Sequence, residues 1–284
     1  MKRILVSLVL VSLIGLSAQA ALVHHWTLDE TSTGAAATIT DTVGGANGAV
    51  AGAGVSPATG FVDGALQFDG TANAHVSIPG FDASALGNMT FTCWMKIEPG
   101  LITPSMTWTR IFSGGDQWEA MMQGDNSADS GKIGNNFWRA GGKVNYPLTA
   151  EVPPEGVWIH VAMTSSLSPP GDGLMQTYIN GELSGFKENV AVSTWGGGEV
   201  RIAHRPGSAA NQHFKGAIDD IKIFDTILSA EEIKAMVPES TVNKVTGIER
   251  VGDDIVVTWD STAGYLYSVV MSDDLADDGA LDVL

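Results

Sequence analysis

The chain has 284 residues, of which 15 are basic and 32 acidic, and a formal charge of −17. A charge of this sign repels nucleic acid and anionic membrane surfaces, so neither is an expected partner. The single cysteine, Cys93, excludes an intramolecular disulfide, but a chain of this length buries enough apolar surface to fold without one.

The N-terminus has the three regions of a secretory signal peptide in order. Lys2 and Arg3 precede an apolar run over 4–16, and an A-x-A cleavage site ends at Ala20, before Ala21. Removing this signal leaves 13 basic residues (15 less Lys2 and Arg3) against 32 acidic ones, a formal charge of −19. No other apolar run approaches the roughly 20 residues that span a bilayer. The mature chain is therefore expected to be secreted, extracellular or at the cell surface, without membrane insertion.

Short segments of alternating apolar and polar residues follow the signal. They predict strands at Leu22–Leu28, Gly48–Val50, Gly64–Gly70, His75–Ile78 and Met89–Ile97. Apart from the strand at Gly48–Val50, the Ala-, Gly-, Thr- and Ser-rich stretch 35–60 is predicted to be loop, because these residues pack poorly and bend easily.

The clearest of these strands is Met89–Ile97. Phe91, Cys93, Met95 and Ile97 fall on one face, so Cys93 is predicted to be a core residue. The other face carries Thr90, Thr92, Trp94 and Lys96. The pattern is typical of a sheet with one packed side and one wetter side.

Further strands follow at the spacing of an all-β sandwich. They are predicted at Trp108–Ser113, Trp118–Met122, Ile133–Trp138, Val157–Ser165 and Val200–Ala203. Leu174–Phe186 is predicted to form a hairpin around Asn180-Gly181, since this residue pair accepts the positive φ angles of a type I′ turn.

The segment 214–238 combines a long strand with a short helix. Ala217, Asp219, Ile221 and Ile223 share one face of a period-2 pattern, so Asp219 is predicted to face inward with the isoleucines. The other face carries Ile218, Asp220, Lys222 and Phe224. Apolar residues on both faces indicate a strand inside a sandwich.

A helix is predicted to begin near Ala230. Ser229 and Glu232 have the spacing of a capping box, and Leu228 and Ile233 that of a hydrophobic staple. Pro238 cannot continue the helix and so marks its end.

Residues 239–284 differ in composition from the rest and are predicted to be an acidic linker and a partial β-sandwich. Ile255–Trp259 and Tyr265–Val269 have strand patterns that resemble the opening of a fibronectin-like domain. The segment is too short for a complete domain of that kind.

Several stretches resemble laminin G-like jelly-roll domains of the concanavalin A-like lectin and glucanase superfamily. They are the Trp26–Glu30 strand end, Phe68-Asp69-Gly70, the Trp158–Ala162 strand, and Gly216–Phe224 with the helix start Leu228–Ile233. The resemblance implies an all-β, two-sheet antiparallel jelly-roll sandwich over residues 21–238, closed by one short C-terminal helix and followed by the partial β segment.

The resemblance also implies a structural Ca²⁺ where the first loop meets the last strand. The matching ligand positions are Asp41, Asn47, Asp219 and Asp220. Oxygen ligands in flexible turns suit Ca²⁺, but Val43 and Ala46 stand where the family has polar residues. The alternative is that Asp41 caps an Asx-turn while Asp219 bonds backbone amides.

Glycan binding needs aromatic faces for sugar rings, with polar or charged groups beside them. Seven residues in or beside the Gly- and Asn-rich loops fit this role, although each tryptophan also has a core alternative. They are Trp108, Arg110, Trp118, Trp138, Arg139, Tyr146 and Trp195.

The sequence lacks the catalytic motif of the enzymes in this superfamily. Laminarinase-like relatives carry a Glu-x-Asp-x-x-Glu strand, which places two carboxylates on one face for retaining hydrolysis, and this sequence has no such run. The predicted function is therefore a non-catalytic module that binds a carbohydrate or an extracellular surface protein, with support from Ca²⁺. Two alternatives stay open: a glycoside hydrolase or its accessory module, and a purely structural adhesion domain of the cell surface.

Overall fold

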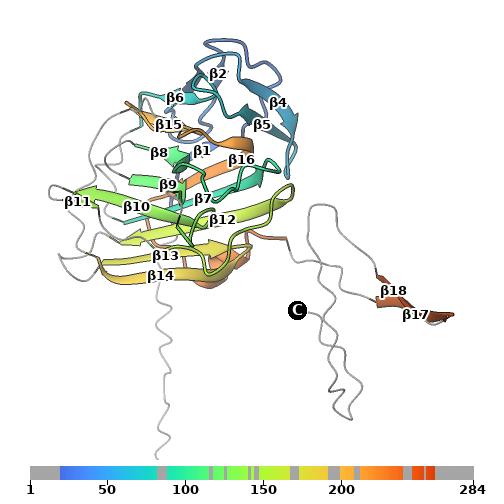
Figure 1. Ribbon diagram of the computed structural model, residues 1–284. Helices are drawn as coiled ribbons and strands as arrows, with labels where there is room; N and C mark the ends of the chain where they lie inside the picture. Colours follow the sequence, from blue (N-terminus) through green and yellow to red (C-terminus); the bar gives the residue numbers. More distant parts are fainter. Residues whose placement is uncertain are drawn as a thin grey trace, which may run out of the picture.

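The computed structural model describes residues 20–81, 88–114, 118–124, 127–139, 142–143, 147–166, 173–190, 199–207, 212–238, 245–252 and 254–259. In these residues the protein is an all-β sandwich of two antiparallel sheets with one short helix (Figure 1). The predicted fold class is confirmed. The proposed signal peptide lies almost wholly outside the described residues.

The first sheet has the order β14-β13-β12-β7-β16-β5-β4, with β1 also paired to β16. Its strands are β1 (Leu22–Trp26), β4 (Val55–Thr59), β5 (Gly64–Asp69), β7 (Asn88–Ile97), β12 (Trp158–Ser166), β13 (Gly173–Ile179), β14 (Glu182–Val190) and β16 (Lys215–Phe224). The predicted closing strand, β16, therefore lies inside this sheet, between β7 and the pair β5 and β1.

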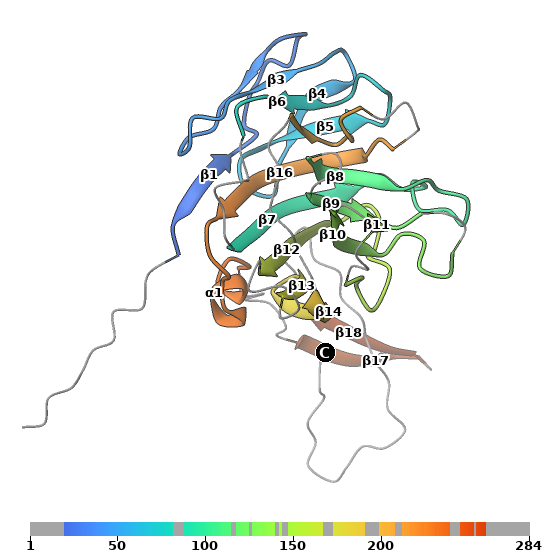
Figure 2. The ribbon, with the colours of Figure 1, turned by 90° about the vertical axis from the view of Figure 1, so that its left-hand side faces the viewer.

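The second sheet has the order β11-β10-β9-β8-β15-β6-β3-β2. Its strands are β2 (Thr38–Ile39), β3 (Gly48–Val50), β6 (Val76–Ile78), β8 (Thr109–Ser113), β9 (Trp118–Met122), β10 (Ile133–Arg139), β11 (Gly142–Lys143) and β15 (Val200–Ile202). Figure 2 shows the two sheets as separate layers, with β16, β7 and β12 in one and β8, β9 and β10 in the other.

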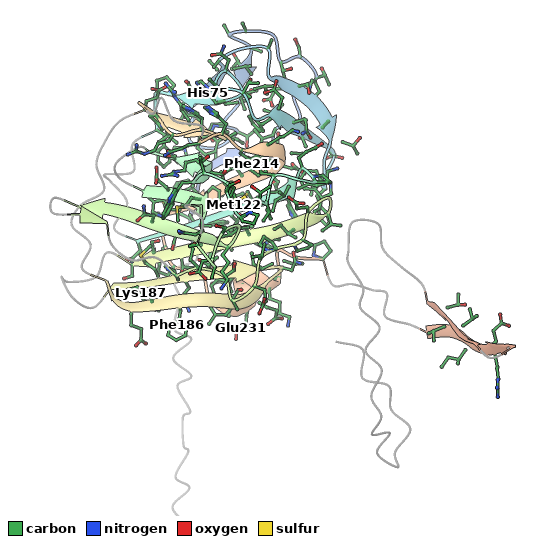
Figure 3. All side chains as sticks on the ribbon, in the orientation of Figure 1. His75, Met122, Phe186, Lys187, Phe214 and Glu231 are labelled. Carbon is green, nitrogen blue, oxygen red and sulfur yellow. The ribbon has the colours of Figure 1, made fainter. Side chains whose placement is uncertain are left out.

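Aromatic side chains fill the space between the two sheets. Phe91 of the first sheet packs against Phe112 and Trp118 of the second, with ring centroids 5.3 Å apart in both pairs. Cys93 lies in the same core and is fully buried, as predicted. Burying a side chain such as that of Phe91 stabilises the fold by roughly 1.5–3 kcal/mol. Figure 3 shows Met122 and Phe214 inside the sandwich, whereas Phe186 lies on its outside, at β14.

A β-bulge in β16 changes which side chains face the core. The β16 register against β7 shifts between Asp219 and Lys222, and Asp220 has a φ of +52°. Ile218 therefore packs in the core with Ile221 and Ile223, and Asp219 falls on the outer face. The prediction that Asp219 shares a face with Ile221 is wrong, because simple alternation assumes a strand without a bulge.

The local predictions around the helix are confirmed. Asn180 and Gly181 have φ angles of +50° and +83° in the β13–β14 turn. Helix α1 (Ala230–Lys234) has the predicted capping box: Ser229 accepts from the Glu232 amide, and Glu232 accepts from the Ser229 amide. Leu228 and Ile233 pack in a small apolar cluster with Phe224, Ala162 and Tyr178.

Two segments differ in detail from the prediction. Stretch 35–60 contains not only β3 but also β2 and the five-residue strand β4, which pairs with β5 along its whole length. In the C-terminal region, the predicted strand at Ile255–Trp259 is part of β18 (Asp254–Trp259), which pairs with β17 (Val245–Val251) in a two-stranded sheet. Tyr265–Val269 lies outside the described residues.

Candidate functional site

One row of polar side chains crosses the outer face of the second sheet. In β9, Trp118, Ala120 and Met122 pack in the core, so Glu119 between them points to the opposite side. The strand register continues this position across five neighbouring strands. We call the residues at this position the polar row: Asn136 of β10, Glu119 of β9, Ser113 of β8, Arg201 of β15 and Ser77 of β6.

Glu119 is the centre of an ion cluster in the polar row. Its carboxylate is fully buried and accepts from Arg110 Nη2 at 2.9 Å, Arg205 Nε at 3.1 Å and Ser113 Oγ at 2.9 Å. Arg110 is only 3% exposed and lies against the Trp108 ring at 5.7 Å. A buried carboxylate is stable only when it is paired and hydrogen-bonded, and here one carboxylate holds two guanidinium groups in place.

Two buried side chains of this face have polar atoms without a partner among the described residues. The Arg110 Nε and Nη1 atoms and both amide atoms of Asn136 make no hydrogen bond there. Asn136 is fully buried. Buried polar groups in folded proteins are almost always satisfied, so these atoms indicate room for a water or a ligand group.

A second polar group extends the row towards β6. Arg201 makes a bidentate ion pair with Glu199, at 2.9 and 3.1 Å, and Ser77 Oγ donates to Glu199 at 2.7 Å. The third guanidinium nitrogen of Arg201, Nη1, contacts His204 Nδ1 at 3.2 Å. The hydrogen bonds from Arg201 lower the pKa of Glu199 and outweigh burial, which acts in the opposite direction.

Three histidines stack beside Arg201. The ring centroids of His204 and His213 are 4.4 Å apart, and those of His204 and His75 are 5.1 Å apart. Burial lowers the pKa of all three, and for His204 the neighbouring His213, His75 and Arg201 further disfavour the protonated ring and lower its pKa to about 4. The stack is therefore neutral at pH 7.

The seven predicted glycan-binding residues fall into three groups. Trp108 and Arg110 come together at the ion cluster, whereas Trp118 packs in the core and is 4% exposed. Trp138 and Arg139 lie on β10, but their side chains are outside the described residues, as are Tyr146 and Trp195 entirely. The structure adds six residues to the candidate site that the sequence did not predict. They are Glu119, Asn136, Ser113, Arg201, Arg205 and Ser77.

One sequence signal would have identified Glu119. It is the only charged residue in the strand Trp-Glu-Ala-Met-Met, and a charge inside an apolar strand requires a partner. The partners themselves carry no such signal, because Arg205 lies 86 residues away in the chain.

The predicted calcium ligands belong to separate hydrogen-bond groups. Asp41 Oδ1 accepts from the amides of His25, Val43 and Gly44, and its Oδ2 accepts from Ala46 and contacts His24 Nδ1 at 2.7 Å. Asn47 accepts from the amide of Asp41 itself. Burial alone would raise the pKa of Asp41, but these hydrogen bonds outweigh it and lower the pKa to about 2.

Asp219 and Asp220 are neighbours with opposite environments. Asp219 is fully buried, and its Oδ2 accepts from the amides of Phe61 and Val62, both at 2.9 Å. Burial, with the nearby negative charge of Asp220, raises the pKa of Asp219 to about 7. Burial also raises the pKa of Asp220, but hydrogen bonds from His25 and Lys222 reverse the shift and lower it.

In the structure, these predicted ligands make hydrogen bonds within the protein. Each carboxylate has at least one oxygen occupied by protein donors, and the described residues contain no group of three or more His, Cys, Asp or Glu side chains that could hold a metal. Ca²⁺ needs six to eight oxygens around one centre. The arrangement has Asp41 capping its own loop and Asp219 bonding backbone amides.

The two antiparallel sheets and the short helix place the protein in the class of two-sheet β-sandwiches. Residues 69–234, more than half of the chain, match the family described as the Concanavalin A-like lectin/glucanases superfamily, in its laminin G form. The chain belongs to this family.

Solved structures agree on the fold. Domain 4 of AbnA, an extracellular GH43 arabinanase from Geobacillus stearothermophilus in complex with arabinotriose, is 18% identical, with a TM-score of 0.57 over 77% of this chain and 98% of that domain. The receptor-binding domain of botulinum neurotoxin type G is 13% identical, with a TM-score of 0.56 over 79% of this chain and 53% of that one. The serotype D ligand-binding domain, in complex with N-acetylneuraminic acid, is 16% identical, with a TM-score of 0.55 over 76% and 50%.

The chain thus spans nearly all of the arabinanase domain and about half of each toxin domain. A search among curated proteins gave no match. In the described part of the chain, no helix has the length and apolar character needed to cross a membrane.

Proposed function

We propose that the protein is an exported, non-catalytic carbohydrate-binding module and that its ligand contacts the outer face of the second sheet. The relatives that support this are binding domains, one in complex with an arabinose trisaccharide and one in complex with a sialic acid. The proposal includes secretion through the N-terminal signal and a glycan of an extracellular surface as the partner.

The observation that carries the proposal is the polar row with its ion cluster. Sugar hydroxyls are recognised by carboxylate, guanidinium and amide groups that are held rigidly. Glu119 and Glu199 fix the guanidinium groups of Arg205 and Arg201 by charged hydrogen bonds. Because the row lies on strands and not on loops, its geometry is set by the sheet.

The experiment is a glycan array followed by titration calorimetry on the ligands found. Arg201→Ala removes a partly exposed member of the row and should weaken binding about tenfold, the effect of losing one charged hydrogen bond. Lys96→Ala is the matched control, since Lys96 is a cation on the outer face of the first sheet, above the Trp158 ring. If Lys96→Ala abolishes binding and Arg201→Ala does not, the site lies on the first sheet.

The same titrations decide the calcium proposal. Affinity measured with an excess of chelator should fall if Ca²⁺ supports the site. Unchanged affinity and an unchanged melting temperature would exclude that role.

An accessory role in a longer glycoside hydrolase is the second candidate. It is favoured by the likeness to a complete domain of an extracellular arabinanase. Fusion of this chain to a hydrolase catalytic domain should then increase hydrolysis of an insoluble polysaccharide and leave hydrolysis of a small soluble substrate unchanged. Hydrolysis by this chain alone would instead make it an enzyme.

A further inference from the structure

The ion pair of Arg201 and Glu199 is the part of the polar face that a ligand can reach. Their side chains are 21% and 37% exposed, whereas the Glu119 carboxylate on the same sheet face is fully buried. Arg201 lies on β15, and Glu199 directly precedes that strand. A ligand on the outer face of the second sheet can therefore contact both charged groups at once.

The charges of this pair are matched. Arg201 Nε and Nη2 donate to the two carboxylate oxygens of Glu199 at 2.9 and 3.1 Å. The three histidines beside the pair are neutral at pH 7, because burial lowers the pKa of each ring. An acidic sugar therefore meets no excess of positive charge at this pair, and the partly exposed Glu199 carboxylate would repel it.

Both partners retain unused hydrogen-bonding groups. A guanidinium group has five N–H donors, and Arg201 uses three of them, two with Glu199 and one with His204 Nδ1. One N–H on Nη1 and one on Nη2 thus have no partner among the described residues. Glu199 Oε1 accepts from Ser77 and from Arg201, but Oε2 accepts only from Arg201 Nη2 there and keeps one acceptor site.

These unused groups are held in fixed positions. Glu199 holds one edge of the guanidinium group, and His204 Nδ1 accepts from Nη1 at 3.2 Å, since arginine can only donate. The His204 ring is 3% exposed and is itself held in the stack, with the His213 ring 4.4 Å away. Groups that are already ordered lose little further freedom when a ligand binds.

We propose that Arg201 and Glu199 form a subsite for two adjacent hydroxyl groups of an uncharged sugar residue. One hydroxyl accepts from the unused N–H groups of Arg201, and the neighbouring hydroxyl donates to Glu199 Oε2. This inference rests on the proposed function and names its ligand class. Adjacent hydroxyls on one ring supply an acceptor and a donor side by side, which matches Nη2 and Oε2, 3.1 Å apart.

The test uses β-linked trisaccharides of xylose, mannose and galactose with two adjacent free hydroxyl groups on each ring. Each is compared, by titration calorimetry with the full chain, with deoxy analogues that lack one of the two hydroxyls. Deoxygenation keeps the ring and adds no charge. Loss of either hydroxyl should weaken binding about tenfold, the effect of losing one charged hydrogen bond. Affinity should change little with salt, because the ligand is uncharged.

Two variants assign the hydroxyls to their partners. Glu199→Gln keeps an acceptor oxygen without the charge, and charged hydrogen bonds are about twice as strong as neutral ones, so the tenfold effect of the donating hydroxyl should fall to about threefold. Arg201→Ala should remove the effect of the accepting hydroxyl. Glu182→Gln is the matched control, because the exposed Glu182 carboxylate pairs with Lys234 at the first sheet, and it should leave every difference as in the parent.

Equal affinity for a sugar and its deoxy analogues, or differences that persist unchanged in folded Glu199→Gln and Arg201→Ala, would overturn the subsite and leave the proposed function standing. A preference for acidic over neutral sugars would do the same. If a variant does not fold, the comparison of sugars on the unaltered chain still decides. Binding to no glycan of any kind would overturn both proposals.

Discussion

Asp41 and Asp219 are two buried aspartates whose environments act in opposite directions. Asp41 is 5% exposed and accepts from four backbone amides and a histidine, and its pKa is about 2. Asp219 is fully buried and accepts from two amides through one oxygen, and its pKa is about 7. Burial raises the pKa in both cases, but the donors outweigh it at Asp41, whereas the negative charge of Asp220 adds to it at Asp219.

The difference follows from how each backbone is shaped. The loop after β1 turns back on itself, so several of its amides converge on Asp41. Asp219 instead lies on a strand whose own amides serve the sheet, and only the crossing segment at Phe61 and Val62 offers donors. That segment fits closely, since a Cβ on Gly60 would lie 2.0 Å from the Gly64 carbonyl oxygen and 2.7 Å from Asp219 Oδ2. Asp41 is therefore ionised at pH 7 and holds its loop together, whereas Asp219, with a pKa of about 7, is only about half ionised at that pH.

The largest expected effect is that of Asp41→Ala. It leaves four amides of the 25–46 region without an acceptor, and charged hydrogen bonds and orphaned donors cost about 1–3 kcal/mol each. Losses within one network do not add fully. We therefore expect the free energy of unfolding, measured by urea denaturation, to fall by about 4 kcal/mol. Asp41→Asn, which keeps one oxygen acceptor, should lose about half as much. A loss below 1 kcal/mol for Asp41→Ala would show that the loop is not organised by its carboxylate.

Asp219→Asn should have the opposite sign. The amide keeps an oxygen for Phe61 and Val62 and removes a charge that burial penalises, so stability at pH 8 should rise by about 2 kcal/mol. At pH 4 the carboxyl is already neutral in the folded protein, and the variant should match the parent. Asp219 Oδ1 is buried and has no hydrogen-bond partner among the described residues. Destabilisation at both pH values would mean that this atom needs a partner that only a carboxyl group provides.

The pH dependence of stability in the parent should combine both groups. The folded pKa of Asp219 is raised, so its contribution is most favourable below about pH 4 and is lost as pH rises towards 7. The folded pKa of Asp41 is lowered, so its stabilisation is complete above about pH 4 and is lost as pH falls towards 2. In thermal melts, Asp219→Asn should remove only the loss of stability between about pH 4 and pH 7, and Asp41→Asn only the loss below about pH 4.

The histidine stack adds a smaller effect in acid. His204 has a folded pKa of about 4, so the neutral ring stabilises the fold above its usual pKa near 6.5, and the contribution falls as pH drops between these values. His204→Phe retains a stacking ring without a titrating group and should reduce the loss of melting temperature between pH 7 and pH 5. An unchanged slope would assign the acid sensitivity elsewhere.

Ser229→Ala gives the smallest effect and a scale for the first. Ser229 caps α1 with one side-chain acceptor for one amide, and loss of such a cap costs about 1 kcal/mol. Ser229→Thr should keep most of this stabilisation, because a threonine hydroxyl can also cap the helix. The ratio of the Asp41→Ala and Ser229→Ala losses then measures what four converging amides add over one.

Features decided by near neighbours in the chain were predictable. Asn180-Gly181 makes its turn because these two residues tolerate positive φ, and the capping box needs only residues three positions apart. The alternation of Met89–Ile97 likewise placed Cys93 in the core. For the candidate site, the sequence predicted Arg110 and Trp108 but not Glu119, the carboxylate between the two arginines.

The features that the sequence could not predict depend on the register between strands that are distant in the chain. The bulge at Asp220 reverses the phase of β16, and nothing in its period-2 pattern announces where one extra residue is accommodated. The polar row likewise exists only because Ser77, Ser113, Glu119, Asn136 and Arg201 align across five strands.

The sequence alone determined the β-rich class, the turn at Asn180-Gly181, the cap of α1 and the apolar faces, because these follow from conformational preferences and periodicity over a few residues. Only the tertiary structure decided that Asp41 is surrounded by donors and Asp219 is not, and that Glu119 meets Arg205 from 86 residues away. The physical reason is that burial, donors and charge partners are supplied by whichever strands pack nearby, and that packing is a property of the whole sandwich.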